Sequence, residues 1–315
     1  MILIRGMHNL RPRHRGCVAT IGNFDGVHQG HQAVFRHLLA KGAEYGLPDQ
    51  VITFEPQPQE YFAPQVAPAR LTRLREKLQA LQETGLQRVL LLEFNARLAA
   101  MDATDFVREV LVDGLGIRFL LVGDDFRFGR DRRGDYRLLC DQGREQGFAV
   151  EDMNTFRLNR DRVSSTRIRE ALTQGDLTGA AALLGRPYCI CGRVGHGAQR
   201  GRTLGFPTAN IDLHRRVSPV HGVFAVWVRG LKGGPRPGVA NIGSRPTISG
   251  ASHDLLEVHL LDFAGNLYGT HLQVELVARL RNEMRFGSVV ELRHQIVRDA
   301  EQARLLLSGP TPDPI

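Results

Sequence analysis

The feature that most constrains the fold is a regular alternation of short apolar runs and amphipathic stretches in the first half of the chain. Apolar runs that favour β-strands fall at residues 17–21, 51–54, 88–93, 117–122 and 148–153. Helical patterns lie between them at residues 30–45, 71–83, 104–112 and 136–146. This alternation predicts a doubly wound, mostly parallel sheet with helices on both faces. Ligands of such folds bind at the carboxyl ends of the strands, so we expect a site there.

The pattern changes near residue 185. Residues 164–184 predict one or two short helices, which end at Gly185-Arg186-Pro187. Beyond them, glycine-rich turns separate short β-type runs at residues 209–213, 223–228, 238–242, 255–261 and 271–280. This texture is typical of a small antiparallel barrel, and residues 289–306 predict a closing helix. We therefore expect an α/β domain at residues 1–184, followed by a β-barrel domain at residues 185–315.

The charge balance favours anionic ligands. The chain carries 41 lysine and arginine residues against 33 acidic ones, a formal net charge of +8. Because the basic residues are spread along the chain, they argue against a nucleic-acid-binding tail. Only Lys41, Lys77 and Lys232 are lysines, and Gly201-Arg202-Thr203 has arginine where a P-loop needs lysine. A P-loop kinase is therefore excluded.

Other sequence features bear on compartment and partners. No apolar run approaches the roughly 20 residues of a membrane-spanning helix, and the first residues lack the apolar core of a signal peptide. Four cysteines are too few for a disulfide scaffold in a chain of this length. We expect a cytoplasmic protein with reduced cysteines and with neither a membrane nor a nucleic-acid partner. The oligomeric state stays open, a weak homo-oligomer included.

A loop with two histidines follows the first predicted strand. It reads G-N-F-D-G-V-H-Q-G-H and ends where the first helix begins. Gly22, Gly26 and Gly30 allow the backbone to turn tightly and approach a ligand, and the helix N-terminus offers N–H groups to phosphate. His28 and His31 are three residues apart, so both rings can stabilise charge on the same phosphates. The alternative is an ordinary pair of helix-capping histidines.

An acidic turn follows the most apolar predicted strand. Asp124 and Asp125 are suited to a ribose or Mg²⁺, and Arg127 to a phosphate. A plain turn is the alternative for either aspartate.

Hydroxyl side chains open a later helix. Ser164 and Thr166 either cap that helix or bind a polyphosphate together with Arg167.

The predicted barrel begins with a glycine-rich stretch that ends in G-F-P-T-A-N. Its glycines are Gly192, Gly195, Gly197, Gly201 and Gly205. Such a stretch is typical of backbone that wraps phosphate. Thr208 and Asn210 alternate onto one face of the strand, and their hydroxyl and amide oxygens suit Mg²⁺ shared with nucleotide phosphates. An ordinary turn with polar strand residues is the alternative.

The two-histidine loop and the later helix start resemble the nucleotidyltransferase superfamily, and the full loop string resembles its bacterial FAD synthetase branch. The string T-F-E-P-Q-P, followed by Tyr61, also resembles that branch and by this resemblance lies beside the flavin. The resemblance implies that Arg167 contacts ATP. Many members have histidine where this chain has Gln57, which leaves the role of position 57 open. The residues expected to bind nucleotide or flavin are Gly22, Phe24, Asp25, Gly26, Gly30, Pro56, Pro58, Phe62, Asp125, Arg127, Ser164 and Thr166.

The barrel sequence resembles bacterial riboflavin kinase. Beside G-F-P-T-A-N, the strings G-V-F-A, E-V-H-L-L-D-F and L-R-N-E-M-R-F occur in that family's order. The resemblance implies that Glu257 is the catalytic base, and a carboxylate can take the proton of a primary hydroxyl that attacks a γ-phosphate. The other residues expected at this site are Gly197, Gly201, Gly205, Phe206, Pro207, Arg281 and Phe286, with Thr208 and Asn210 at the metal.

Together the two motif sets resemble bacterial bifunctional riboflavin kinase/FAD synthetase. The resemblance implies that the barrel phosphorylates riboflavin to FMN. It implies that the first domain joins FMN to the AMP part of ATP, with His28, His31 and Arg167 as catalytic residues. ATP, Mg²⁺ and flavins are then the expected small molecules.

Several alternatives stay open. The chain could be a riboflavin kinase whose first domain is inactive, a transferase for another phosphorylated acceptor, or a basic nucleic-acid-binding protein. Within the first domain, Asp25, Asp124 and Asp125 are all candidates for holding Mg²⁺.

Overall fold

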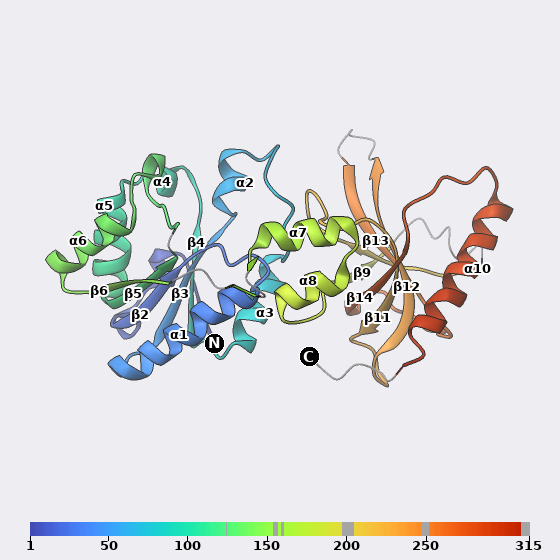
Figure 1. Cartoon of the computed structure of the whole chain (residues 1–315), viewed down its shortest axis with the longest axis horizontal. Coiled ribbons are helices and arrows are strands. Elements are labelled where there is room, and N and C mark those ends of the chain that lie inside the picture. Colours follow the sequence, from blue (N-terminus) through green and yellow to red (C-terminus); the bar gives the residue numbers. More distant parts are fainter. Residues whose placement is uncertain (124, 154–156, 159–160, 197–204, 247–251, 310–315) are drawn as a thin grey trace. The chain divides into compact units, whose positions relative to one another are not determined.

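The computed structural model describes residues 1–123, 125–153, 157–158, 161–196, 205–246 and 252–309. The chain forms two compact units (Figure 1). The first comprises Met1–Pro68 and Leu74–Ser164, and the second comprises Ala69–Arg73 and Ser165–Ile315. The chain thus passes into the second unit after Ser164, and the boundary expected after residue 184 stays a prediction about catalytic domains.

A six-stranded parallel sheet forms the centre of the first unit. Its strands are β1 (Ile2–Arg5), β2 (Cys17–Ile21), β3 (Asp49–Glu55), β4 (Arg88–Glu93), β5 (Ile117–Gly123) and β6 (Ala149–Met153). Their order is β1-β4-β3-β2-β5-β6. The five predicted strands and the doubly wound fold class are confirmed. The sequence analysis missed β1, because four residues at a sheet edge make too short a pattern.

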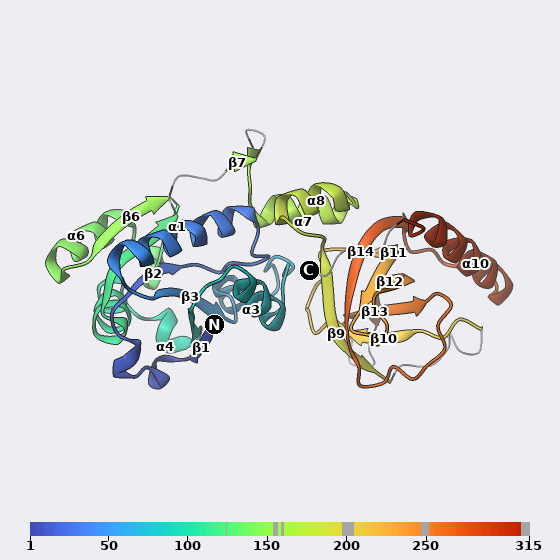
Figure 2. The same cartoon turned by 90° about the horizontal axis from the view of Figure 1, so that it is seen from below.

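Helices cover both faces of this sheet. One face packs against α1 (Gln29–Tyr45), which runs beside β2 in Figure 2, and against α3 (Leu74–Glu83). The other face packs against α6 (Tyr136–Gln146) and the π-helical segment η3 (Val107–Leu115). The shorter elements are α2 (Pro58–Phe62), α4 (Ala96–Ala99) and α5 (Ala103–Phe106), with 3₁₀ turns at Met7–Asn9, Pro12–His14 and Arg130–Arg132. The helix predicted at residues 104–112 is thus α5 together with η3.

The second unit contains a closed antiparallel barrel with strand order β10-β13-β12-β11-β14-β9. Its strands are β9 (Cys189–Gly195), β10 (Ala209–Asp212), β11 (Gly222–Arg229), β12 (Arg236–Pro246), β13 (Ser252–Leu260) and β14 (His271–Arg281). The predicted barrel is confirmed. The sequence analysis missed β9, because Gly192 and Gly195 interrupt its apolar pattern. A Cβ on Gly192 would lie 2.3 Å from Ile211 Cγ2, so the glycine permits close packing in the barrel.

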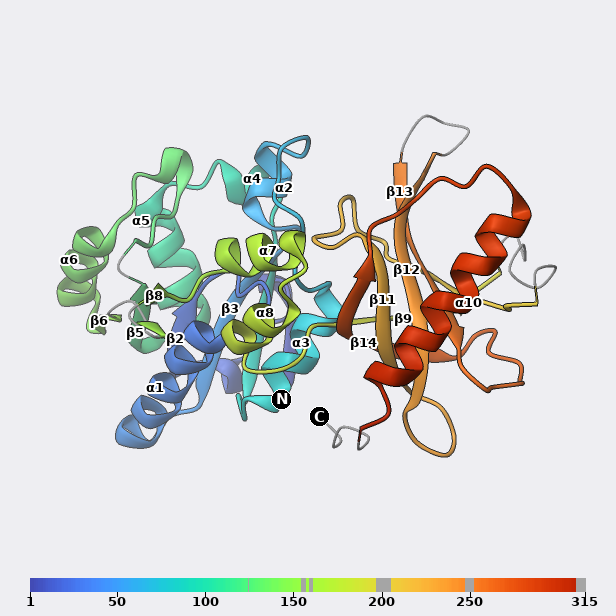
Figure 3. The ribbon, with the colours of Figure 1, turned by 45° about the vertical axis from the view of Figure 1, so that its right-hand side comes forward.

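Within the described residues of the second unit, the structure has three helices. The stretch predicted as one or two short helices before the barrel forms two, α7 (Ser165–Gln174) and α8 (Leu177–Leu184). The closing helix α10 (Val289–Leu306) has the predicted bounds. In Figure 3, α10 lies across the outside of the barrel. Its residues Ala300 and Ala303 pack against Ala225 and Leu261 of the barrel.

A short segment from the first half of the chain, Ala69–Arg73, also belongs to the second unit. The Tyr188 hydroxyl donates a hydrogen bond to the Leu71 carbonyl at 3.2 Å, and Arg215 Nη1 donates to the Arg70 carbonyl at 3.3 Å. Leu71 is fully buried. This anchoring explains why α3 begins at Leu74 rather than at residue 71, where the apolar spacing predicted its start.

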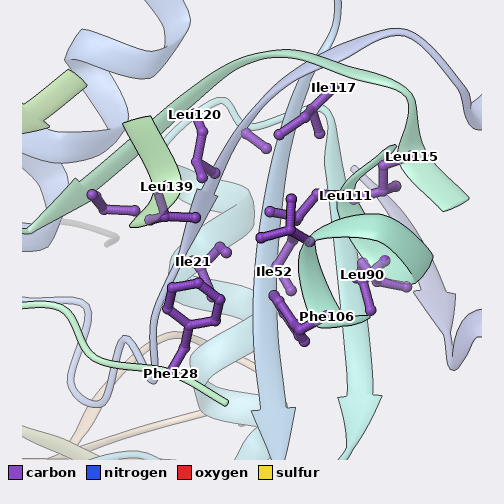
Figure 4. Packing of buried hydrophobic residues seen from close by; sticks show 14 of the residues in the cluster. Ile21, Ile52, Leu90, Phe106, Leu111, Leu115, Ile117, Leu120, Phe128 and Leu139 are labelled. Atoms are coloured by element: carbon purple, nitrogen blue, oxygen red, sulfur yellow. The ribbon is translucent and has the colours of Figure 1, made fainter. Parts of the chain in front are cut away.

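The core of one face of the parallel sheet is shown in Figure 4. Along β2, Cys17, Ala19 and Ile21 belong to this cluster, whereas Val18 belongs to the cluster on the opposite face. This period of two is that of a strand. The side chains that meet them from other elements include Ile52, Leu90, Phe106, Leu111, Leu120 and Leu139. Because β2 is buried on both faces, packing fixes the position of its carboxyl end, from which the next loop starts.

None of the helices in the described part of the chain combines the length and the apolar character that a membrane span requires.

A matched pair of leucines in the second unit tests the barrel core. Leu256 is fully buried, whereas Leu305 on α10 is 78% exposed. We expect Leu256→Ala to lower the free energy of unfolding by about 2–5 kcal/mol, because it leaves a cavity. Leu305→Ala should change that free energy by less than about 0.5 kcal/mol. Urea unfolding followed by circular dichroism measures both, and equal effects would contradict the assigned packing.

Candidate active sites

The loop between β2 and α1 has an unusual and largely buried backbone. Phe24 and Val27 have φ angles of 48° and 45°, and Gly26 has one of 85°. A positive φ is energetically costly for a residue with a Cβ. The burial of Phe24, Asp25 and Val27 keeps the loop in this conformation. The loop follows β2, where the winding of the sheet reverses from β3 to β5. It therefore stands where open α/β sheets bind ligands.

His28 and His31 form a stacked pair at the start of α1. Their ring centroids are 3.5 Å apart, with an angle of 18° between the planes. His28 Nδ1 accepts a hydrogen bond from the backbone N–H of His31 at 3.3 Å, so His28 caps the helix. The proton of a neutral His28 ring then resides on Nε2, which becomes a donor. Capping and phosphate binding, posed as alternatives by the sequence, are therefore compatible at His28.

Two of the loop's glycines make room for these rings. A Cβ on Gly30 would lie 3.2 Å from the His28 ring, and one on Gly22 would lie 2.9 Å from the Phe24 ring. The Phe24 ring in turn packs edge-on against His31, with centroids 5.2 Å apart. The glycines thus have a packing role in addition to the backbone role expected from the sequence.

A cavity of about 660 Å³ lies next to this loop in the first unit. Its aromatic wall comes from Phe54, Phe62 and Phe94, and the Phe62 and Phe94 rings meet edge-on with centroids 5.5 Å apart. The predicted site residues that line it are Gly22, Pro58, Phe62, Asp125 and Arg127. An aromatic cavity with a few polar groups at its rim suits a flat ring system that carries a polar chain.

Two of the polar residues at the cavity rim make hydrogen bonds within the protein. Asp125 Oδ2 accepts a hydrogen bond from Arg162 Nη2 at 2.8 Å, and Arg127 Nη1 donates to the Phe126 carbonyl at 3.0 Å. Arg132 lines the cavity as well and was not predicted. Asp124 lies outside the described residues.

Position 57 lies at the start of α2. Gln57 is buried, and its backbone N–H donates to Glu60 Oε2 at 2.9 Å. Its Nε2 is also buried and has no hydrogen-bond partner among the residues that the structure describes. Pro58 lines the aromatic cavity, whereas Pro56 is half-buried beside it in the sequence and is not part of the lining.

The predicted residues at the later helix start fall in both units. Ser164 ends the first unit, and Thr166 and Arg167 lie in the first turn of α7 in the second. Their contact with ATP stays a prediction.

In the barrel, three polar side chains stand in a row on neighbouring strands. Glu257 on β13 pairs directly with Asn210 on β10 and with Asn241 on β12. Residues directly opposite one another share a face of a sheet. The residues that alternate with them, among them Ile211, Leu256 and Ile242, are fully buried. The polar row therefore lies on the outer face of the barrel. Its member Asn241 was not among the predicted site residues, because only strand register places it beside Glu257.

Two cavities flank this row and share Thr208. One, of about 340 Å³, is lined by apolar and charged side chains, among them Phe206, Glu257, Arg281, Met284, Phe286 and Asp299. The other, of about 550 Å³, is lined by Pro207, Thr208 and Asn210 together with residues 263–268. Since Thr208 lines both, two ligands can meet there.

The side-chain amide of Asn210 fits a metal ligand. Asn210 Nδ2 donates to the Thr208 carbonyl at 3.3 Å, which orients the amide. Asn210 Oδ1 is buried and accepts no hydrogen bond within the described ranges. A buried oxygen without a partner is costly unless a ligand satisfies it. No cluster of three or more His, Cys, Asp or Glu side chains suited to a metal occurs in the described part of the chain, so a metal here would depend on such neutral oxygens.

The remaining predicted residues of this site are placed as follows. Gly197 and Gly201 lie outside the described residues. Gly205 has a φ of 83°, which suits glycine. The Phe206 ring meets His259 edge-on at 5.4 Å between centroids, and the His259 Nδ1 lies 2.9 Å from the Pro207 carbonyl.

Two family models match the chain. The model described as FAD synthetase matches residues 10–167, and the one described as riboflavin kinase matches residues 184–307.

Curated relatives span the same length. A protein of Escherichia coli (strain K12) named bifunctional riboflavin kinase/FMN adenylyltransferase is 54% identical over 305 residues, which cover 96% of this chain and 97% of that protein. A protein of the same name from Pseudomonas fluorescens is 53% identical over 306 residues, covering 97% of this chain and 98% of that protein.

A solved structure also shares the fold. A protein from Streptococcus pneumoniae described as a macrolide-efflux protein has a TM-score of 0.79 and 29% identity, covering 96% of this chain and 99% of that one. A shared fold does not transfer an activity, so its description is not extended to this chain.

Both motif sets identified in the sequence thus fall within matched family models, and relatives above 50% identity cover nearly the whole chain. The chain belongs to the family of bifunctional riboflavin kinase/FMN adenylyltransferases.

Proposed function

We propose that this chain phosphorylates riboflavin to FMN in its C-terminal domain, residues 185–315, and adenylylates FMN to FAD in its N-terminal domain, residues 1–184. The observation that carries the proposal is the pair of cavities that share Thr208, with Glu257 on one and Asn210 on the other. This arrangement suits transfer of a phosphoryl group from one bound ligand to another. The alternative of a kinase with an inactive first domain has no support, since the FAD synthetase model also matches.

In the kinase reaction, riboflavin occupies the 340 Å³ cavity and ATP the 550 Å³ cavity. Glu257 takes the proton of the terminal ribityl hydroxyl. As this proton leaves, the hydroxyl oxygen attacks the γ-phosphorus of ATP, and ADP leaves. Thr208 and Asn210 hold Mg²⁺, which neutralises charge on the phosphates when bound. Phe206, Arg281 and Phe286 contact the flavin. Gly197, Gly201, Gly205 and Pro207 belong to the phosphate-binding stretch.

In the adenylyltransferase reaction, the flavin ring of FMN occupies the 660 Å³ aromatic cavity. An FMN phosphate oxygen attacks the α-phosphorus of ATP, and pyrophosphate leaves. His28 donates from Nε2 to the phosphates, and its stacked neighbour His31 acts with it. Asp125 is assigned to a ribose or Mg²⁺ and Arg127 to a phosphate. Ser164 and Thr166 are assigned to the polyphosphate of ATP from their hydroxyls near the start of α7, and Arg167 is assigned to ATP on the family resemblance.

The remaining assignments are part of the proposal. The catalytic domains comprise residues 1–184 and 185–315. The small-molecule partners are ATP, riboflavin and FMN, without nucleic acid or membrane. A cytoplasmic location stays a prediction from the sequence.

Separating the two activities tests the assignment. With riboflavin, ATP and Mg²⁺, we expect His28→Ala to accumulate FMN, because adenylylation slows by about 10²- to 10³-fold when a charge-stabilising donor is lost. Glu257→Gln should slow FMN formation by about 10²- to 10⁴-fold, since the general base is lost. Chromatography of the three flavins measures both reactions.

Each variant carries its own folding control. His28→Ala should phosphorylate riboflavin at the normal rate, and Glu257→Gln should make FAD from supplied FMN. A wild-type protein that stops at FMN with ATP in excess would refute the proposed adenylyltransferase.

The metal assignment is tested by the two asparagines that flank Glu257. We expect Asn210→Ala to raise the Mg²⁺ concentration for half-maximal kinase activity by roughly tenfold, because one oxygen ligand is lost. Asn241→Ala, which faces the other cavity, should leave that concentration unchanged. A Mg²⁺ titration of the initial rate measures both, and equal shifts would contradict the assignment.

A further inference from the structure

The chain segment after β14 forms one wall of the 340 Å³ cavity. Glu283, Met284 and Phe286 of this segment line the cavity. The segment lies between β14 and α10, outside both elements. Its position must therefore be maintained by side-chain contacts, and the two ends of the segment show them.

The first end is held by a buried ion pair between Arg281 and Asp299. Arg281 Nε lies 3.1 Å from both Asp299 carboxylate oxygens, and Nη2 lies 2.9 Å from Oδ2. The side chains are only 18% and 5% exposed. A bidentate arginine–carboxylate pair fixes orientation as well as distance.

Asp299 is itself held in place. Gln295, one turn earlier on α10, donates from Nε2 to Asp299 Oδ1 at 2.8 Å. The neighbouring Ala300 packs in the apolar cluster between α10 and the barrel. The Asp299 carboxylate therefore lies on the part of α10 that packs against the barrel.

Arg281 connects Asp299 to the cavity wall. Its Nη1 donates to the Asn282 carbonyl at 3.0 Å, and its guanidinium lies 5.7 Å from the centre of the Phe286 ring. One arginine thus contacts both the first residue of the segment and an aromatic ring near its end.

The second end is held by the start of α10. Glu291 Oε2 accepts a hydrogen bond from the Gly287 N–H at 2.9 Å, and the Ser288 hydroxyl accepts one from the Glu291 N–H at 3.2 Å. These contacts are exposed, so the buried pair at Asp299 is the stronger of the two anchors.

We propose that Asp299 is a positioning residue for riboflavin phosphorylation. It holds Arg281, and through Arg281 it keeps residues 282–286 in the form that receives the flavin ring. Asp299 acts on riboflavin binding rather than on proton transfer, which belongs to Glu257. The inference rests on the proposed function of this cavity.

The test is steady-state kinetics of Asp299→Asn in the full chain. We expect the KM for riboflavin to rise about ten- to a hundredfold, because Arg281 loses a charged, buried partner. The kcat of the kinase, the KM for ATP and the adenylylation of supplied FMN should stay within about twofold of wild type. A general loss of structure would instead lower the kcat of the kinase and the rate of adenylylation together.

Two further variants complete the design. Arg304→Gln breaks a second ion pair of α10, from Arg304 Nη2 to Asp262 Oδ1 at 2.9 Å. This pair is exposed and lines neither barrel cavity. It should leave the KM for riboflavin unchanged. Asp299→Asn should add nothing in an Arg281→Gln background, since both changes remove one interaction.

The outcomes separate the hypotheses. An unchanged KM for riboflavin, additive effects in the double variant, or equal losses in both reactions would overturn the role of Asp299. If Asp299→Asn does not fold, Gln295→Ala tests the role of Asp299 instead. A smaller rise in the KM for riboflavin supports this role, and an unchanged KM overturns it. A wild-type protein without riboflavin kinase activity would refute the proposed function instead.

Discussion

Backbone hydrogen bonding between strands is the constraint on which both units depend. In the first unit, parallel pairing brings the carboxyl ends of all strands to one edge, so the site is built from the loops that leave that edge. In the second unit, antiparallel register sets Glu257 between Asn210 and Asn241, so the site is built from side chains within strands. One kind of interaction thus produces a loop-based site and a strand-based site.

The loop-based site depends on close packing of a kind that small sequence changes would disturb. His28 caps α1 and stacks on His31, while Gly30 leaves the space that the His28 ring occupies. The hydrogen bond that caps the helix also decides which ring nitrogen carries the proton. The capping that the structure shows and the phosphate contact proposed for His28 therefore use the same imidazole.

The strand-based site depends on α10, which does more than cover the barrel. The apolar contacts of Ala300 and Ala303 hold α10 on the outer face, and this places Asp299 beside Arg281. This helix packing thereby helps to set the position of Arg281, which lines the 340 Å³ cavity. Glu257 lies within a barrel strand, whereas residues 282–287 lie between β14 and α10 and are contacted at their ends by side chains of both.

The sequence by itself determined the order and type of most elements, because periodicity of apolar residues is a local property. It placed α10 at residues 289–306, and it located the two-histidine loop and G-F-P-T-A-N from motifs of consecutive residues. It did not reveal β1 and β9, whose patterns are short or broken by glycine. Only the tertiary structure decided that Asn241 stands beside Glu257, that Ala69–Arg73 packs with the second unit, and that Asp299 holds Arg281. These facts depend on strand register and on packing between distant segments, and no local pattern encodes them because the partners are far apart along the chain.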